Sequence, residues 1–277
     1  MPFPVTGLKD GKEVYTKWYD GFEGKKWIAL PDKHVDKLYI DYHKNTLEVN
    51  GKNNYIRTSG IFRKVNPISF HPVGPLEQPH YTQVNFMPAF GYNYYNKMML
   101  GIYFHSAFFP PDNFRYNVIP LYSIGTNDLA GTGNFSYKFY PEESVFRNIE
   151  LNLSGKKFAF NNQKGDYFNK LKLESTFEFE HNDSNNQNSS ELNISSVYAT
   201  DISSILNTPE NLSHKTFANL EYAYRNSLNN NPFTGNLGLE MSDNFVKASL
   251  TSEYNIQPFS DINRTIDIKL FAGTFLE

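Results

Sequence analysis

The sequence predicts an all-β fold, built as an antiparallel up-and-down meander, and three observations lead to that prediction. Apolar residues alternate with polar ones, as at Phe135, Tyr137 and Phe139, which is the period of a strand. Short polar turns separate long runs of this kind, and no stretch shows the three- to four-residue period of a helix. Aromatic residues, which favour strands, make up 16% of the chain.

The sequence predicts a small β-sheet module for residues 1–60 and a connector for residues 61–80. Within the module, glycines and a Pro-Asp pair separate three short runs with strand character: Val14–Trp18, Lys26–Leu30 and Lys37–Asp41. Proline cannot donate to a strand ladder, and the connector is marked by Pro67, Pro72, Pro75 and Pro79.

Residues 81–277 predict the meander, with about eleven strands joined mostly by tight hairpins. The expected strands are 82–95, 97–109, 114–125, 129–140, 145–160, 167–181, 190–202, 213–227, 232–243, 245–257 and 264–276. Turn-forming residues mark the reversals at 110–113, 125–128, 141–144, 161–166, 182–190, 229–232 and 258–263.

The lengths of these strands favour a membrane barrel. At roughly ten to twelve residues they exceed the roughly five or six of soluble sheets and match the roughly nine to eleven that cross a bilayer. Aromatic residues also gather near strand ends, as in membrane girdles: Tyr94, Tyr95, Phe108, Phe109, Tyr140, Phe158, Phe160, Tyr167, Phe168 and Phe259. The sequence therefore predicts an outer-membrane-type β-barrel, with a soluble sandwich as the alternative.

Composition excludes several other classes. The net charge of -3, with no basic run beyond short clusters such as Lys25-Lys26, argues against nucleic acid as a partner. The chain has 0 cysteines, which excludes disulfides and thiolate metal sites. The sequence contains no run of about eighteen apolar residues, so it predicts no transmembrane helix. The mean hydropathy of -0.54 is, however, compatible with alternating strands that cross a bilayer.

The first residues, Met1–Gly7, lack the charged segment and apolar core of a secretory signal. A barrel of the outer membrane must be exported. We therefore expect the chain to be the C-terminal part of a longer precursor; otherwise the barrel prediction is wrong.

Several unusual pieces of sequence resemble a known family: Gly21–Lys26, Phe108–Pro111, Asp128–Gly133 and Phe139–Pro141. Together they resemble the C-terminal region of zinc metallopeptidases of the aminopeptidase N-like gluzincin family from Bacteroidota. The resemblance implies a small β module, expected in the periplasm, followed by an outer-membrane β-barrel. The partners it implies are outer-membrane lipid and an N-terminal peptidase domain of the same precursor. Zinc is expected only in that absent catalytic domain.

The catalytic signature of that family, H-E-x-x-H, grips zinc with two imidazoles one helical turn apart and activates water with a carboxylate. It is absent, because no histidine is followed by glutamate. We therefore assign no catalytic, cofactor-binding or metal residue and expect no cofactor in this chain. The chain is expected to be the non-catalytic end of a zinc aminopeptidase. The histidines are His34, His43, His71, His80, His105, His181 and His214.

Three groups of residues invite functional interpretations beside plainer ones. The first group, His34, Asp36, Asp41 and His43, is either a metal cluster or a set of solvated side chains along a strand. A phosphate loop at Gly131 and Gly133 competes with glycines that relieve crowding at a barrel wall, since no third glycine or helix follows. An ion-selective lining competes with a solvated face for the charged row Lys172, Glu174, Glu178 and Glu180.

The sequence thus predicts a non-catalytic outer-membrane anchor; a porin-like or transport barrel and a soluble all-β binding module are the alternatives. The side chains expected to face lipid are Phe135, Tyr137, Phe139, Leu151, Leu171, Leu173 and Leu220. Those expected to face the lumen are Asn134, Ser136, Lys138, Lys172 and Glu178. Because single-chain barrels close with an even strand number, we also expect an incomplete barrel whose last strand, 264–276, lacks a partner.

Overall fold

The computed structural model describes residues 1–24, 26–31, 33–46, 54–61, 63, 68–73, 81–106, 112–160, 167–181, 188–202, 212–227, 231–256 and 265–276. These residues form strands and no α-helix, which confirms the all-β prediction. No helix in this part of the chain is long and apolar enough to cross a membrane. The chain divides into two compact units, Met1–Phe86 with Ser106–Asp112, and Met87–His105 with Asn113–Glu277.

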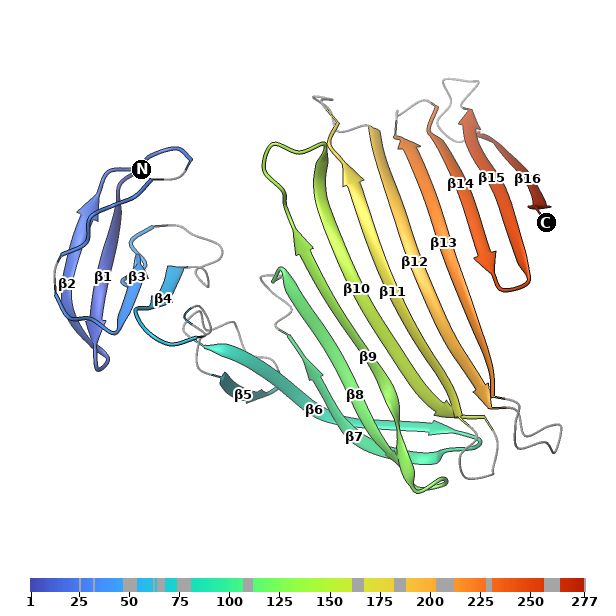
Figure 1. Cartoon of the computed structure of the whole chain (residues 1–277), viewed down its shortest axis with the longest axis horizontal. Helices are drawn as coiled ribbons and strands as arrows, with labels where there is room; N and C mark the ends of the chain where they lie inside the picture. The colour runs from blue at the N-terminus through green and yellow to red at the C-terminus, as the bar shows by residue number, and fades with distance from the viewer. Residues whose placement is uncertain are drawn as a thin grey trace. The chain divides into compact units, whose positions relative to one another are not determined.

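The first unit contains a four-stranded sheet with the order β2-β1-β3-β4 (Figure 1). Its strands are β1 (Phe3–Lys9), β2 (Lys12–Tyr19), β3 (Lys37–Ile40) and β4 (Tyr55–Arg57). Leu8, Tyr39 and Tyr55 form its buried core, with Tyr42 packed against them. Burial raises the pKa of the Tyr39 hydroxyl to about 12.

The sequence pattern predicted β2 and β3 but not β1 and β4. The signal for β1 was present at Asp10-Gly11, where φ is 49° and 76°. Positive φ at both central residues makes a hairpin turn that suits Asp-Gly, and it pairs β1 with β2. The three residues of β4 are too few to show alternation.

The predicted strand Lys26–Leu30 is wrong, because none of these residues is in a strand. The Trp27 side chain is 100% exposed, so this run buries no apolar face. A single hydrogen bond, 2.8 Å from the Tyr19 hydroxyl to the Ala29 carbonyl, ties it to β2. A short apolar run without a partner strand gains too little to become a strand.

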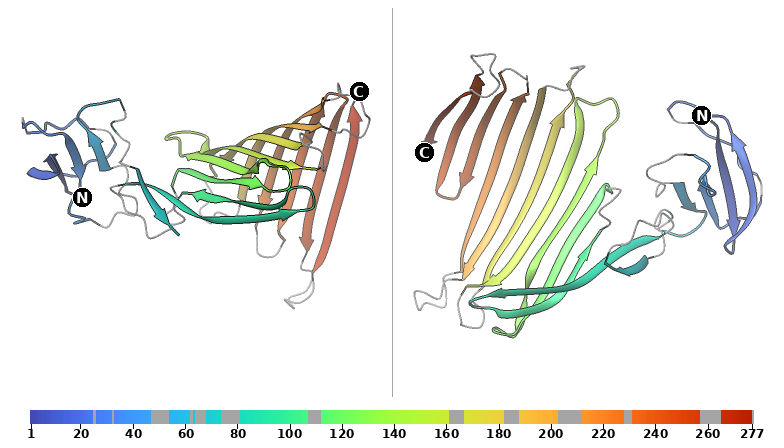
Figure 2. Two further views of the ribbon diagram at one scale, coloured as in Figure 1. Left: turned by 90° about the horizontal axis from the view of Figure 1, so that it is seen from below. Right: turned by 180° about the vertical axis from the view of Figure 1, so that it is seen from behind.

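The remaining strands form one mixed sheet of 12 strands in sequence order from β5 to β16, with β5 and β16 at its edges (Figures 1 and 2). β5 (Ile68–Pro72) pairs in parallel with the start of β6, although its residues were predicted to be a connector. The others are β6 (Thr82–Asn93), β7 (Lys97–His105), β8 (Phe114–Ser123), β9 (Asp128–Phe139), β10 (Phe146–Ala159), β11 (Tyr167–Phe179), β12 (Asn188–Ile202), β13 (Leu212–Asn226), β14 (Phe233–Ser242), β15 (Phe245–Ile256) and β16 (Ile266–Leu276).

The strands β6 to β16 correspond one by one to the eleven predicted strands, and neighbours from β7 to β16 pair antiparallel. The meander is therefore confirmed. One correction concerns 188–189, which were predicted to be loop but begin β12. The predicted turns at 110–111, 161–166, 182–187 and 258–263 and much of 229–232 lie outside the described residues.

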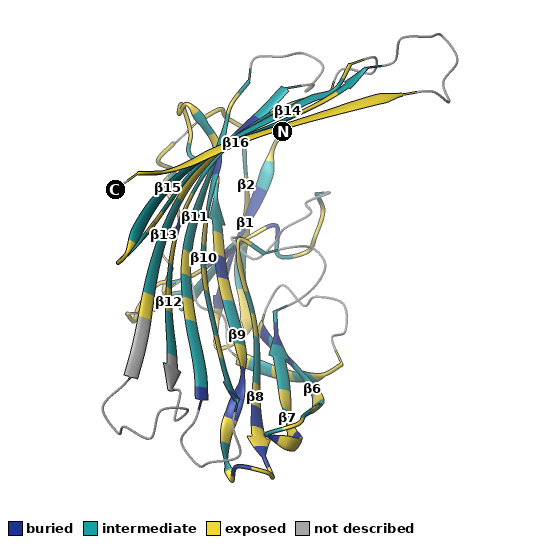
Figure 3. Ribbon diagram, turned by 90° about the vertical axis from the view of Figure 1, so that its right-hand side faces the viewer, coloured by how far each residue is buried: buried dark blue, intermediate teal, exposed yellow. Residues whose placement is uncertain are grey.

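The sheet is not closed. Among the described residues β16 pairs only with β15, and all of its residues are exposed along the edge (Figure 3). The expected lack of a partner for the last strand thus holds for this part of the chain. At the other side the sheet curls, so that Ala89 of β6 and Phe158 of β10 pack against one buried cluster of Met99, Leu121 and Ala130.

Asp41 supplies a test of the small sheet. Its carboxylate accepts hydrogen bonds from the backbone N–H groups of Asn45 (2.7 Å) and Thr46 (2.6 Å) and from the Thr46 hydroxyl (2.5 Å). Burial alone would raise the pKa of Asp41, but these hydrogen bonds lower it overall. The stability that Asp41 contributes is therefore complete above its unfolded pKa of about 3.9 and is lost as pH falls through the lower folded pKa.

We expect Asp41→Ala to destabilise this unit by about 1–3 kcal/mol at pH 7, and the difference from wild type to shrink below about pH 4. Both tryptophans lie in this unit; Trp27 is already fully exposed, so the change in fluorescence comes from the half-buried Trp18 on β2 and reports the urea unfolding of this unit selectively. Asp20→Ala is the control, since Asp20 is exposed, and should change stability by no more than about 0.5 kcal/mol. Equal losses in the two variants would contradict the role assigned to Asp41.

Candidate functional site

One face of the large sheet carries exposed apolar side chains. They come from every strand between β9 and β16, and each is between 37% and 64% exposed. This apolar face consists of Phe135, Tyr137, Leu151, Leu153, Leu171, Leu173, Ile194, Tyr198, Leu220, Tyr222, Leu237, Met241, Leu250, Tyr254, Ile266, Ile268 and Leu270. Singly exposed apolar residues are ordinary, but a continuous patch of this extent marks a surface that contacts something other than water.

The strand register places these residues on one face. Leu153 lies opposite Phe135 of β9 and opposite Leu173 of β11. Leu220 lies opposite Ile194 of β12 in the same way. Residues directly opposite each other in antiparallel strands share a face, so the apolar face continues from strand to strand. The predicted grouping of the apolar side chains is therefore confirmed.

The other face is polar. The register again aligns its members, since Asn152 lies opposite Ser136 on one side and Glu174 on the other. We call this the polar face: Asn134, Ser136, Lys138, Glu150, Asn152, Ser154, Lys172, Glu174, Glu178, Glu191, Asn193, Ser195, Asn219, Glu221, Arg225, Asn236, Glu240, Lys247, Ser249, Thr251, Glu253, Asp267 and Lys269. Its side chains are mostly less exposed than those of the apolar face.

Ion pairs tie the polar face together across strands. They are Arg115–Glu150 (2.8 Å), Arg147–Glu178 (3.4 Å), Arg225–Glu191 (3.0 Å), Lys247–Glu240 (3.8 Å) and Lys269–Glu253. Partly exposed pairs of this kind contribute only about 0–1 kcal/mol each. Their effect is to cancel charge along the face and to hold neighbouring side chains in one arrangement.

The predicted charged row lies largely on this face. Lys172 Nζ is 2.8 Å from Glu174 Oε1, which also accepts a 2.9 Å hydrogen bond from the Asn193 amide. Glu178 pairs with Arg147 and with the Asn148 amide. Glu180 follows the end of β11. Around Lys172 and Glu174 the face forms a polar hollow of about 610 Å³, which extends to Glu221 and Ser249.

Gly131 and Gly133 lie inside β9 and not in a loop, so the phosphate-loop interpretation is wrong. Gly131 has φ of 140°, and a Cβ there would lie 2.1 Å from the carbonyl oxygen of Ile119. Only glycine fits where two backbones approach this closely. The residue therefore lets β8 and β9 pack tightly, as the plainer interpretation proposed.

Three of the four candidate metal ligands are directed to other partners. The Asp36 carboxylate accepts a 3.1 Å hydrogen bond from the backbone N–H of Asp10, and Asp41 binds the turn described above. His43 Nε2 lies 3.0 Å from Glu13 Oε2. In the part of the chain that the structure describes, no three His, Cys, Asp or Glu side chains are grouped to hold a metal ion. A catalytic zinc site does not fit these residues.

The predicted aromatic girdle is wrong for some of its members and otherwise stays a prediction. Tyr94 and Tyr140 are 65% and 61% exposed beside strand ends. Phe158, by contrast, packs into the Met99 cluster, and Tyr167 is only 6% exposed. The burial of these two side chains was not predicted, because proximity to a strand end does not reveal on which face an aromatic residue lies. Phe108, Phe109 and Phe259 lie outside the described residues.

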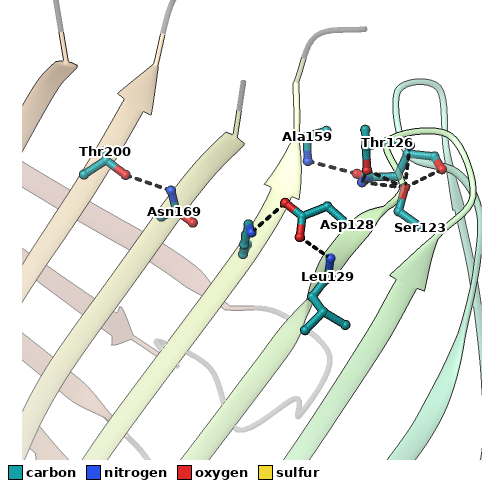
Figure 4. A network of polar contacts seen from close by, with 9 residues as sticks. Ser123, Thr126, Asp128, Leu129, Ala159, Asn169 and Thr200 are labelled. Atoms are coloured by element: carbon teal, nitrogen blue, oxygen red, sulfur yellow. Dashed lines mark hydrogen bonds and ion pairs between the residues drawn. The ribbon is translucent and has the colours of Figure 1, made fainter. Parts of the chain in front are cut away.

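A polar network at the turns between β6 and β7 and between β8 and β9 was also missed (Figure 4). Asn96 is fully buried, and its amide donates to the Ser123 hydroxyl (3.1 Å) while its Oδ1 accepts from the backbone of Ala159 (2.9 Å). The Ser123 hydroxyl donates to the backbone carbonyl of Asn96 and accepts a 2.8 Å hydrogen bond from the Thr126 hydroxyl. This network joins the end of β10 to a turn 63 residues earlier.

Comparison with known proteins identifies no relative: no protein-family model, curated protein or solved structure matches the chain. A functional assignment therefore depends on the two faces of the large sheet and on the chemistry of their residues.

The Asn96 network can be tested by truncation. We expect Asn96→Ala to lower the free energy of unfolding by about 1–3 kcal/mol, because it removes the acceptor of the buried Ala159 N–H and one hydrogen bond to the Ser123 hydroxyl. Urea unfolding of the full chain in a neutral detergent, followed by the strand signal in far-UV circular dichroism, measures this loss. Asn236→Ala removes an amide from the polar face and should cost no more than about 0.5 kcal/mol. If both variants unfold at the same urea concentration, the network does not stabilise the curl.

Proposed function

We propose that the large sheet is the wall of an outer-membrane β-barrel, with its apolar face toward lipid and its polar face toward the lumen. We propose further that the chain is a non-catalytic membrane anchor. The observation that carries this proposal is the continuous apolar face on strands of 10 to 15 residues from β9 to β16. Lipid hydrocarbon is the environment in which such a face is stable.

Strand length supports the same conclusion. A tilted strand needs about nine to eleven residues to cross a bilayer, and nearly all strands from β6 to β16 have ten or more. Soluble strands average about five or six residues. The strands among the described residues of the second unit also belong to a single sheet, whereas a soluble sandwich needs two sheets that cover each other's apolar faces.

The polar face favours an anchor over a pore. Its charges are largely paired, as in Arg225–Glu191 and Lys172–Glu174, and amides such as Asn134 bind their neighbours across the strands. Side chains that are paired with one another fill a lumen and stabilise the sheet, whereas a lumen that conducts ions needs charged groups that are accessible to the ions. A conducting barrel is the second candidate, favoured by the polar hollow next to Glu174, and single-channel recording in planar bilayers tests it.

We propose the parent protein from the sequence resemblance alone. In this proposal the chain follows the catalytic domain of a gluzincin-type zinc aminopeptidase of Bacteroidota. The four-stranded sheet lies in the periplasm, and zinc belongs to the preceding peptidase domain. Detection of an H-E-x-x-H motif in the same precursor is the measurement that tests this part.

Leu173 and its neighbour Lys172 point to opposite faces and make a matched test. Leu173 is 55% exposed, so an arginine there would be well tolerated in water but costs roughly 2–4 kcal/mol at a bilayer midplane. We expect Leu173→Arg to reduce strongly the fraction of chain that folds into lipid vesicles. Lys172→Gln should fold like wild type, and glutamine avoids placing a second carboxylate beside Glu174.

The folded fraction is measured by protease protection and by the heat-dependent gel shift of folded barrels. Equal folding of Leu173→Arg and wild type in vesicles, together with a chain that stays monomeric without detergent, would exclude the membrane wall. That outcome would support the soluble all-β binding module.

A further inference from the structure

Three lysines form a row on the same side of the large sheet as the polar face. Lys156 of β10 lies opposite Lys170 of β11, which lies opposite Ala199 of β12, which in turn lies opposite Lys215 of β13. The row therefore runs straight across four strands. It contains no carboxylate, so it concentrates positive charge at this level of the sheet.

These lysines differ from three other lysines of the polar face. Lys172, Lys247 and Lys269 each pair with a glutamate. Among the residues whose side chains the structure describes, none forms an ion pair with Lys156, Lys170 or Lys215, although Lys156 Nζ lies 5.4 Å from the centre of the Phe168 ring. An ammonium group without a carboxylate partner is available to an anion from outside the chain.

Apolar side chains lie directly beside the row. Val197 and Phe217 occupy the next level of the sheet, opposite each other, and Phe168 lies on the other side of the row. Together with Ala199, Lys170 and Lys215 they line a hollow of about 470 Å³. Asn219 and Glu240 complete the lining, and Glu240 is paired with Lys247. The volume falls within the roughly 300–1,000 Å³ of small-molecule pockets.

We propose that this hollow binds a single-chain fatty acid. The carboxylate lies between Lys170 and Lys215, where charge-assisted hydrogen bonds from two ammonium groups hold it. The acyl chain leaves the row on the side of Val197 and Phe217 and lies along these two side chains, whose surfaces it removes from water. Charge and apolar surface must both be present in the ligand, so neither an inorganic anion nor a neutral lipid satisfies the whole site. The site lies on the side opposite to the apolar face, so the proposal does not depend on membrane insertion.

The test uses the full chain in a neutral detergent and the fluorescent fatty acid cis-parinaric acid as the probe. We expect saturable binding at one site per chain and displacement by palmitate. The uncharged methyl ester of the same probe should bind at least tenfold more weakly. Lys170→Gln with Lys215→Gln should weaken binding of the acid at least tenfold and leave the methyl ester unchanged.

Two further variants keep the result interpretable. Lys138→Gln with Lys269→Gln removes the same charge from the polar face outside the hollow and should bind like wild type. Ala199→Leu fills the hollow and should weaken both the acid and the ester. Circular dichroism and urea unfolding verify that each variant is folded. Equal affinity of the wild type and the Lys170/Lys215 variant for the acid, equal affinity for acid and ester, or only non-saturable uptake into micelles would each overturn the proposal.

Discussion

The register of backbone pairing is the constraint on which the large sheet depends. Side chains alternate between the faces with a period of two, so a slip of one residue would move every leucine of a strand to the polar side. The pairing of Leu153 with both Phe135 and Leu173 fixes three strands at once. A slip would also separate Arg225 from Glu191. The ion pairs thus act mainly to specify the register, since each contributes little to stability.

The parts of the fold that could be predicted from sequence are those that repeat. Leu171 and Leu173 alternate with Lys172 and Glu174 over a full strand, and such a pattern has one interpretation for the backbone. The short strands β1 and β4 could not be found in this way, and Asp10-Gly11 was the one local signal for the first hairpin. The alternation does not by itself predict contact with a membrane, because a soluble sheet can show the same alternation.

The missed features share a physical cause, which is that they depend on contacts between distant residues. Asn96 and Ala159 meet only because the sheet curls, and nothing near either residue indicates the other. The buried Phe158 looked like a girdle aromatic for the same reason. Likewise, the unpaired row of Lys156, Lys170 and Lys215 is visible only when four strands are aligned.

The direction of the edge strands limits how such a sheet can become a tube. Each step along the meander reverses direction, and ten steps separate β6 from β16, so these two strands run the same way. A direct seam between them would be parallel, with slanted and slightly weaker hydrogen bonds than the other joints. The residues Thr82–Phe86 of β6 are already bonded to β5. A cylinder formed by this sheet would therefore have one built-in line of weakness, where an additional strand enters most readily.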